Sequence, residues 1–165
     1  MENLEFWLKG PVPYIPALLQ PVAHALLQVQ KELKVILADA KDAILWEKPK
    51  GMASVGFHLQ HLSGVLDRLF TYANGQMLLE SQLNYLSTEG VPQPHLSLVT
   101  LQENFDEQVT KALQQLQKTD PLTLTEIRHV GRKRLETTVI GLLFHAAEHT
   151  TRHYGQLLVT VNLLK

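Results

Sequence analysis

The chain has 165 residues, 45% of them apolar and 19% charged, and a formal net charge of −1 at pH 7. This size and balance predict one globular domain over residues 1–165, and they lack the basic excess that nucleic-acid binding requires. With no cysteine, disulfides and thiolate sites are excluded, so any metal ion must be held by His, Asp or Glu. No secretory signal or membrane-spanning apolar run is visible, and we expect a soluble cytoplasmic protein.

The N-terminal part contains a proline-rich segment followed by a helix. Pro11, Pro13, Pro16 and Pro21 predict an extended lead-in, with Pro21 able to occupy the first turn of the next element. From about residue 18 to residue 43, apolar residues recur at the spacing of one helical face. They are Val22, Leu26, Val29, Leu33, Ile36, Leu37 and Ala40.

The middle of the chain predicts a second long helix. It extends over about residues 53–74, with Ser54 as its N-cap and Asn74-Gly75 as its stop signal. Residues 76–87 can form a short extra helix, and residues 88–97, which contain glycine and two prolines, are predicted to be a loop.

The C-terminal half predicts two more long helices. The third covers about residues 100–118, and the fourth begins after Thr137 or Thr138, either of which can cap it, and ends near residue 163. Residues 122–136 between them show no convincing strand alternation. The fold class predicted is therefore all-α: a four-helix bundle with a proline-rich N-terminal lead-in.

Three histidines of the last helix are spaced four residues apart. His149 and His153 fall on the apolar stripe that should face the core, where an unpaired polar group costs about 1–3 kcal/mol. Imidazoles four residues apart lie on one face and can share an ion, whereas His145 and His153 are about 12 Å apart along the axis. Either His145/His149 or His149/His153 can therefore form a metal-binding pair.

A third ligand would have to come from another helix. His58 and His61 lie near the start of the second helix, and His61 can complete a three-histidine site if that helix packs beside the last one. Three imidazoles leave one coordination position open, as catalytic zinc sites require. The simpler alternative is that each of these histidines is a hydrogen-bonded core residue without a ligand role.

Residues 145–149 also match the inverted zinc-peptidase pattern His-x-x-Glu-His. Such enzymes need a further acidic ligand downstream, and the sequence contains no Asp or Glu after Glu148. We therefore do not expect peptidase chemistry, and Glu148 is predicted to accept a hydrogen bond from an imidazole or to be a solvated residue.

Two segments together resemble the DinB-like superfamily. They are residues 54–68, SVGFHLQHLSGVLDR, and residues 145–156, HAAEHTTRHYGQ. The resemblance implies a four-helix bundle that holds a divalent metal, zinc or nickel, through His61, His149 and His153. His58 stands beside the matching position in the second helix, and Arg152 occupies a position where many members have histidine.

The resemblance also implies a range of functions. Members include proteins induced by DNA damage, proteins of unknown role and enzymes that use low-molecular-weight thiols for transfer or isomerisation. Homodimers are common, and DNA binding is not implied. A small thiol bound by this chain could place its carboxylates on Arg152 or on the basic segment 128–134.

Two hypotheses from different classes follow. In the first, the protein is a metal-dependent thiol transferase or isomerase with an open coordination position. In the second, it is a non-catalytic module in which the ion joins the second helix to the fourth, with His58 as a fourth ligand that closes the site.

Overall fold

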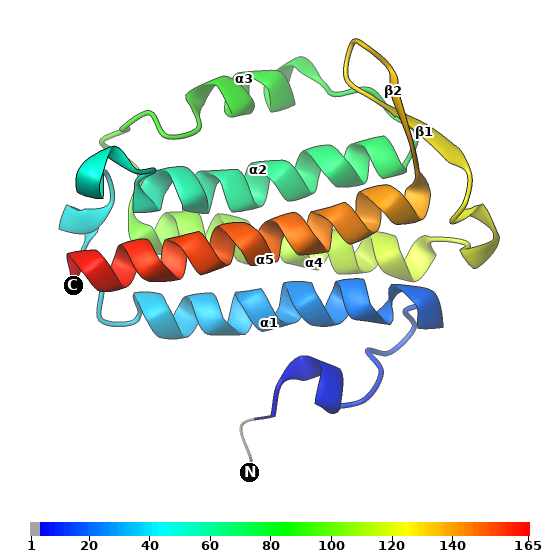
Figure 1. Cartoon of the computed structure of the whole chain (residues 1–165), viewed down its shortest axis with the longest axis horizontal. Coiled ribbons are helices and arrows are strands. Elements are labelled where there is room, and N and C mark those ends of the chain that lie inside the picture. Colours follow the sequence, from blue (N-terminus) through cyan, green and yellow to red (C-terminus); the bar gives the residue numbers. More distant parts are fainter. Residues whose placement is uncertain (1–3) are drawn as a thin grey trace.

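The structure is a computed structural model that describes residues 4–165. Within them, four long helices form a bundle, a shorter helix lies outside it, and a two-stranded hairpin precedes the last helix (Figure 1). The bundle helices are α1 (Gln20–Leu37), α2 (Val55–Ala73), α4 (Leu98–Lys118) and α5 (Val139–Leu164). The outer elements are α3 (Glu80–Thr88), β1 (Ile127–Val130) and β2 (Leu135–Thr138). The prediction of an all-α bundle with an extra helix is confirmed.

Helix starts are set by local chemistry. The side chains of Ser54, Ser97 and Thr138 each accept a hydrogen bond from the backbone N–H three residues later, which satisfies a donor that the helix itself leaves free. Pro21 occupies the first turn of α1, where its missing N–H costs nothing. The predicted caps Ser54 and Thr138 are thus confirmed.

The first helix is shorter than predicted, because it ends at Leu37 instead of residue 43. The following segment forms a 3-10 turn, Asp42–Ile44, and the Asp42 carboxylate accepts a hydrogen bond of 2.8 Å from the backbone N–H of Leu98 at the start of α4. This contact across the bundle satisfies a free N–H of α4, and helical spacing within α1 gives no sign of it.

The hairpin is a feature that the sequence-based prediction missed. β1 and β2 pair antiparallel, with Ile127 opposite Thr138, and the turn uses positive φ at Gly131 and Arg134. The segment leading into β1 also supports α5: Glu126 and Leu124 accept hydrogen bonds from the first backbone N–H groups of that helix. Each strand has only four residues, too few for alternation to be evident.

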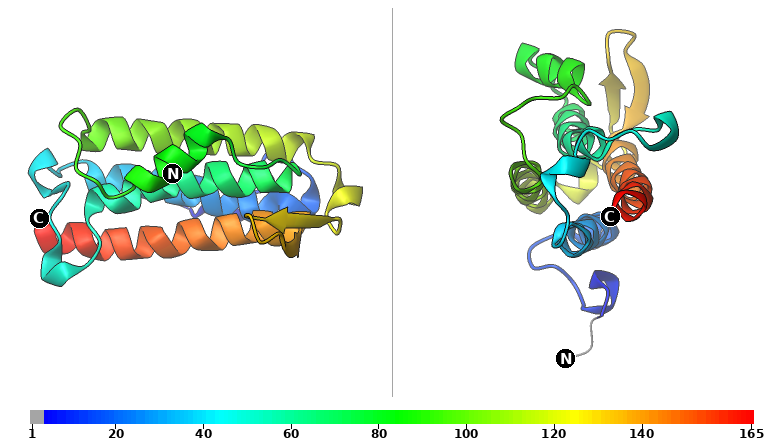
Figure 2. Two further views of the ribbon diagram at one scale, coloured as in Figure 1. Left: turned by 90° about the horizontal axis from the view of Figure 1, so that it is seen from above. Right: turned by 90° about the vertical axis from the view of Figure 1, so that its left-hand side faces the viewer.

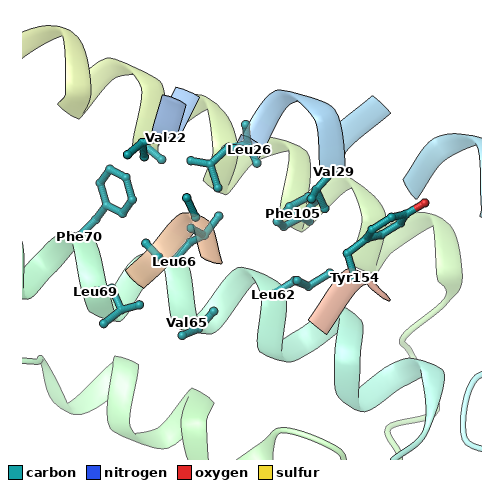
Figure 3. Close-up of a cluster of buried hydrophobic side chains, with 14 of the residues drawn as sticks. Val22, Leu26, Val29, Leu62, Val65, Leu66, Leu69, Phe70, Phe105 and Tyr154 are labelled. Carbon is teal, nitrogen blue, oxygen red and sulfur yellow. The ribbon is translucent and has the colours of Figure 1, made fainter. Parts of the chain in front are cut away.

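The core lies between the four long helices (Figure 2). α2 packs against α5 and α4, and α1 packs against the same two helices. Leu26, Leu66 and Phe105 are fully buried where these helices meet (Figure 3). α2 and α5 run side by side in opposite directions, which brings the early turns of α2 next to the later half of α5 (Figure 1). No helix within residues 4–165 is long and apolar enough to cross a membrane.

Candidate metal centre

Three histidines converge where α2 and α5 meet. One ring nitrogen from each of His61, His149 and His153 lies within 4.8 Å of the others, and all three residues are half-buried. Nε2 of His61 is 2.8 Å from Nε2 of His149, and the His153 ring centroid is 4.3 Å from that of His61. The antiparallel packing of α2 and α5 thus brings together nitrogens from residues 88 apart in sequence.

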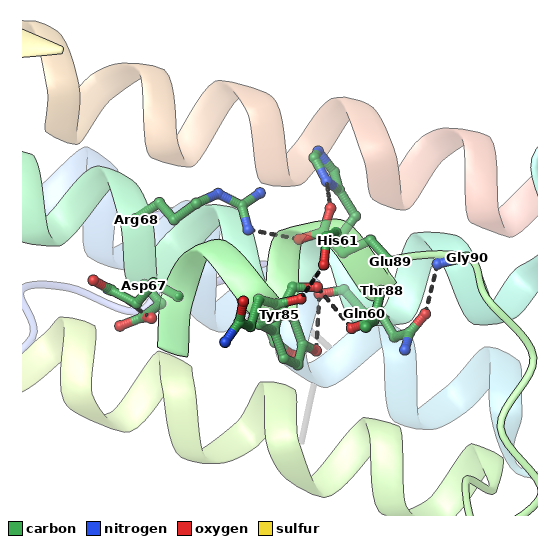
Figure 4. A network of polar contacts seen from close by, with 12 residues as sticks. Gln60, His61, Asp67, Arg68, Tyr85, Thr88, Glu89 and Gly90 are labelled. Carbon is green, nitrogen blue, oxygen red and sulfur yellow. Dashed lines mark hydrogen bonds and ion pairs between the residues drawn. The ribbon is translucent and has the colours of Figure 1, made fainter. Parts of the chain in front are cut away.

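A buried carboxylate orients the α2 histidine. Oε2 of Glu89 lies 2.6 Å from Nδ1 of His61, and Oε1 accepts a hydrogen bond of 2.6 Å from the Arg68 guanidinium (Figure 4). The Glu89 side chain is only 4% exposed. A carboxylate in this place holds the proton on Nδ1, so the Nε2 lone pair of His61 faces the other two histidines. Metal-binding histidines characteristically have such an acceptor behind them.

A glycine in α2 makes room for this carboxylate. A Cβ atom at Gly64 would overlap the Glu89 carboxylate, the Arg68 guanidinium and the Tyr85 ring. The end of α3 is held over this spot because Tyr85 donates a hydrogen bond to the Gln60 carbonyl. Gly64 therefore lets Glu89 approach α2 closely enough to reach His61.

The sequence-based reasoning missed Arg68 and Glu89. Arg68 did carry a signal in the sequence, because it is a cation seven residues after His61 in a largely apolar helix, and the structure buries it. Glu89 carried none, since it follows α3 in a segment predicted to be a loop.

His58 is a neighbour of the three-histidine group. Its side chain is buried, with 3% of the residue exposed, and its Nδ1 lies 3.2 Å from Nδ1 of His153. One of the two rings must donate in this contact. When His153 is the donor, its proton lies on Nδ1, its Nε2 is free and His58 is the acceptor. The structure thus places His58 as a hydrogen-bond partner of His153.

A second group, more exposed, shares one histidine with the first. His145, Glu148 and His149 also offer atoms within 4.8 Å of one another. The side chains of His145 and Glu148 are 49% and 41% exposed, and the carboxylate of Glu148 accepts hydrogen bonds of 2.8 Å from Arg152. Because this carboxylate is solvated and paired with a cation, the group with His61 and His153 is the better metal site.

Arg152 sits at the rim and contacts a candidate ligand. Its Nη2 is 3.0 Å from Nδ1 of His149. A guanidinium only donates, so this Nδ1 must accept, and the proton of the neutral ring lies on Nε2, facing His61. A ligand role for Nε2 of His149 requires that proton on Nδ1 instead. The Arg152 contact and metal ligation by His149 Nε2 therefore exclude each other.

The electrostatics of the cluster favour neutral imidazoles. Burial, followed by the charges of neighbouring groups, lowers the pKa of His58, His149 and His153 to about 4. Burial raises the pKa of Glu89, but the hydrogen bonds from His61 and Arg68 outweigh it and hold that pKa below its ordinary value. At neutral pH these three rings are in the form that a metal ion requires.

The basic segment 128–134 does not reach the histidines. Arg128 donates to the carbonyl of Ala73 at the C-terminal end of α2, about 18 Å from His61 at ~1.5 Å per residue. Arg134 contacts His129 within the hairpin. The expectation that this segment could bind a ligand at the site is therefore wrong, because the hairpin packs against the opposite end of α2.

Comparison with known proteins identifies the family and the fold. The sequence-family model that describes the DinB superfamily matches residues 25–157 of the chain. Among solved structures, a DinB-like protein from Bacillus cereus ATCC 10987 aligns with a TM-score of 0.67 at 19% identity, covering 89% of this chain and 90% of that one. No curated protein matches the chain significantly.

Proposed function

The chain belongs to the DinB superfamily, and on that premise we propose that it is a divalent-metal-dependent enzyme that acts together with a small thiol. The observation that carries the proposal is the half-exposed convergence of His61, His149 and His153, with Glu89 behind His61. The buried carboxylate supports a ligand role, because metal-binding histidines usually donate their other ring N–H to such an acceptor.

The donor set fits zinc or nickel. All three side chains offer imidazole nitrogens, which suit these borderline ions, and the chain contains no thiolate to compete. Two outer partners hold the rings: Glu89 at Nδ1 of His61 and His58 at Nδ1 of His153. His149 becomes available once its proton moves to Nδ1 and Nη2 of Arg152 no longer donates to that atom.

A divalent ion at three imidazoles would lower the pKa of a thiol or water that occupies the remaining position. The chain's own residues would bind and orient the substrate. Arg152, released from His149, is the cation nearest to the site that can receive a carboxylate of the thiol. Glu148, already paired with Arg152, would keep that guanidinium at the rim.

The alternative is a non-catalytic module in which the ion only joins α2 to α5, with His58 as the fourth ligand. It has less support, because Nδ1 of His58 faces His153 and His58 is absent from the group of atoms within 4.8 Å. We also propose that the protein is a cytoplasmic homodimer, that DNA damage induces it and that it does not bind nucleic acid. These proposals rest on the family resemblance and on the near-neutral net charge.

A cobalt-substituted sample separates the two alternatives. An open site predicts that adding cysteine or glutathione changes the visible absorption spectrum of the cobalt-loaded protein, because sulfur enters the coordination sphere. A spectrum that does not respond to either thiol, in a sample shown by elemental analysis to hold one ion per chain, would exclude the enzyme proposal and favour the closed module.

A further inference from the structure

We propose that a groove beside the histidine cluster binds the apolar part of a small carboxylate-bearing molecule whose charged end faces Arg152. The inference deepens the function proposed above, because it names the class of molecule presented to the metal site, and its catalytic meaning rests on that function. The groove is a cavity of about 570 Å³, within the usual range for small-molecule sites. It lies between the residues just before α2 and the last turns of α5.

The walls of the groove are mainly apolar. Met52 and Ala53 form one side, and Gly155 and Val159 form the other. Met52 and Val159 are 44% and 56% exposed, so each presents apolar surface to solvent. An alkyl or similar apolar group would remove this surface from water, which is the main source of affinity in such sites.

Gly155 has no evident structural reason to be glycine. A glycine inside a helix destabilises it relative to alanine. The φ of Gly155 is not among the positive ones, so the backbone does not require it. A Cβ at this position would meet nothing within 4 Å, so close packing among the described residues does not require it either. The glycine leaves this side of the groove without a side chain.

One nitrogen of the Arg152 guanidinium is available to an anion at the groove. Among the described residues that line the groove, Arg152 is the only cation and none is a carboxylate. Glu148 accepts hydrogen bonds from both Nε and Nη2 of Arg152, and His149 accepts one from Nη2. Nη1 has no hydrogen-bond partner within residues 4–165. A carboxylate can therefore bind Nη1 without displacing either contact, and it gains Nη2 as well when His149 ligates a metal.

The groove is continuous with the candidate metal site. His58 lines it and contacts His153, and Arg152 lines it and contacts His149. A molecule with its carboxylate on Arg152 would thus lie next to two candidate ligands. Because metal ligation by His149 frees Arg152, metal and carboxylate should strengthen each other's binding, by the same factor in each direction.

The test uses the full-length protein and octanoate as the probe, measured by titration calorimetry with zinc and again after chelation. We expect octanoate to bind in both states, more tightly with zinc, and octylamine to bind at least about tenfold more weakly. Gly155→Leu, which fills the groove at an exposed helical position, should weaken octanoate binding about tenfold or more in both states. Gly155→Ala should have a much smaller effect.

Two further variants keep the test decisive. Val159→Glu places a negative charge in the groove and should also weaken octanoate binding, whereas Glu103→Leu, an exposed position on α4 away from the groove, should leave it unchanged. Two results would overturn the proposal. In the first, octanoate binds both Gly155→Leu and Val159→Glu as tightly as it binds the wild type. In the second, octanoate binds only when zinc is present, and neither substitution weakens that binding. A change in oligomeric mass by Gly155→Leu, with octanoate binding intact, would instead assign the groove to a second copy of the chain.

The outcome is separable from that of the metal proposal. Octanoate binding to the chelated protein tests the groove alone, and the cobalt spectrum with thiol tests the metal site alone. A groove that binds octanoate in a protein that takes up no metal would keep this inference and remove its catalytic meaning.

Discussion

The two pairs of helices in this bundle bury different kinds of side chain. Every buried residue of α1 and α4 is apolar, whereas α2 buries His58, Gln60, Ser63 and Arg68. α5 adds Thr150 and Thr160. Apolar burial stabilises the fold without further conditions, but polar burial costs free energy unless each group is paired. The comparison teaches that α1 and α4 contribute apolar packing alone, while α2 and α5 also carry the buried polar groups, among them those around the candidate metal site.

The sharpest way to separate the two regions is to remove His149. We expect His149→Ala to abolish stoichiometric zinc or nickel, because this residue belongs to both candidate groups of ligands. His153→Ala should do nearly the same. The matched control is His145→Ala, which should retain the ion. Elemental analysis of the purified variants checks this, and loss of metal in His145→Ala with retention in His153→Ala would assign the site to the exposed group.

A substitution in the apolar pair of helices should show the opposite pattern. Phe105 on α4 is fully buried, and Phe105→Ala should lower the free energy of unfolding by about 3–5 kcal/mol through lost burial and a residual cavity. Its metal affinity at room temperature should stay within about twofold of the wild type. Denaturant unfolding and metal titration measure the two effects, and a large loss of affinity in a folded Phe105→Ala sample would mean that the apolar pair and the site are coupled.

The buried carboxylate should have an intermediate effect. Glu89→Gln keeps the shape but removes the charge behind His61, and we expect metal affinity to fall about 10–100-fold, as is typical when an outer partner of a ligand is lost. Glu80→Gln, the same change at an exposed position of α3, is the control and should have no effect. Competition with a chelator of known affinity gives both values, and equal affinities for the two variants would remove Glu89 from the site.

The smallest effect concerns pH. His149 and His153 have pKa values lowered to about 4, so they are already neutral at pH 6 and protons compete with metal only at lower pH. Proton competition at His149 and His153 should therefore weaken metal binding little between pH 7.5 and pH 6 and strongly between pH 5 and pH 4. Titration of the His149 and His153 ring signals by NMR in the metal-free protein checks the cause, and midpoints near pH 6.5, the value of a free histidine, would contradict the lowered pKa values.

The same shifts determine how the metal-free protein responds to acid. Between about pH 6.5 and pH 4 the unfolded chain binds protons at these histidines and the folded chain does not. Stability therefore rises with pH across this window and is lost as the pH falls through it. Thermal melts of the chelated protein at pH 7, 6 and 5 check the sign, and a stability that increases toward pH 5 would refute it.

Much of the bundle was predictable because its signals are local. The apolar spacing of Val22, Leu26 and Val29, and the caps Ser54 and Thr138, depend only on residues within a few positions of one another. The spacing of His149 and His153 likewise places both on one helix face. Spacing alone does not bring these two residues to His61. It does so only if the second and last helices pack side by side, and the structure shows that they do.

The rest depended on contacts between distant segments. The sequence by itself determined the helices and their histidines, since helical periodicity and capping are short-range. Only the tertiary structure decided that Glu89 reaches His61 over Gly64, that the Arg128 segment lies at the far end of α2, and that Gly155 opens a groove. The physical reason is that hydrogen bonds and cavities depend on the relative positions of packed helices, which no local pattern encodes.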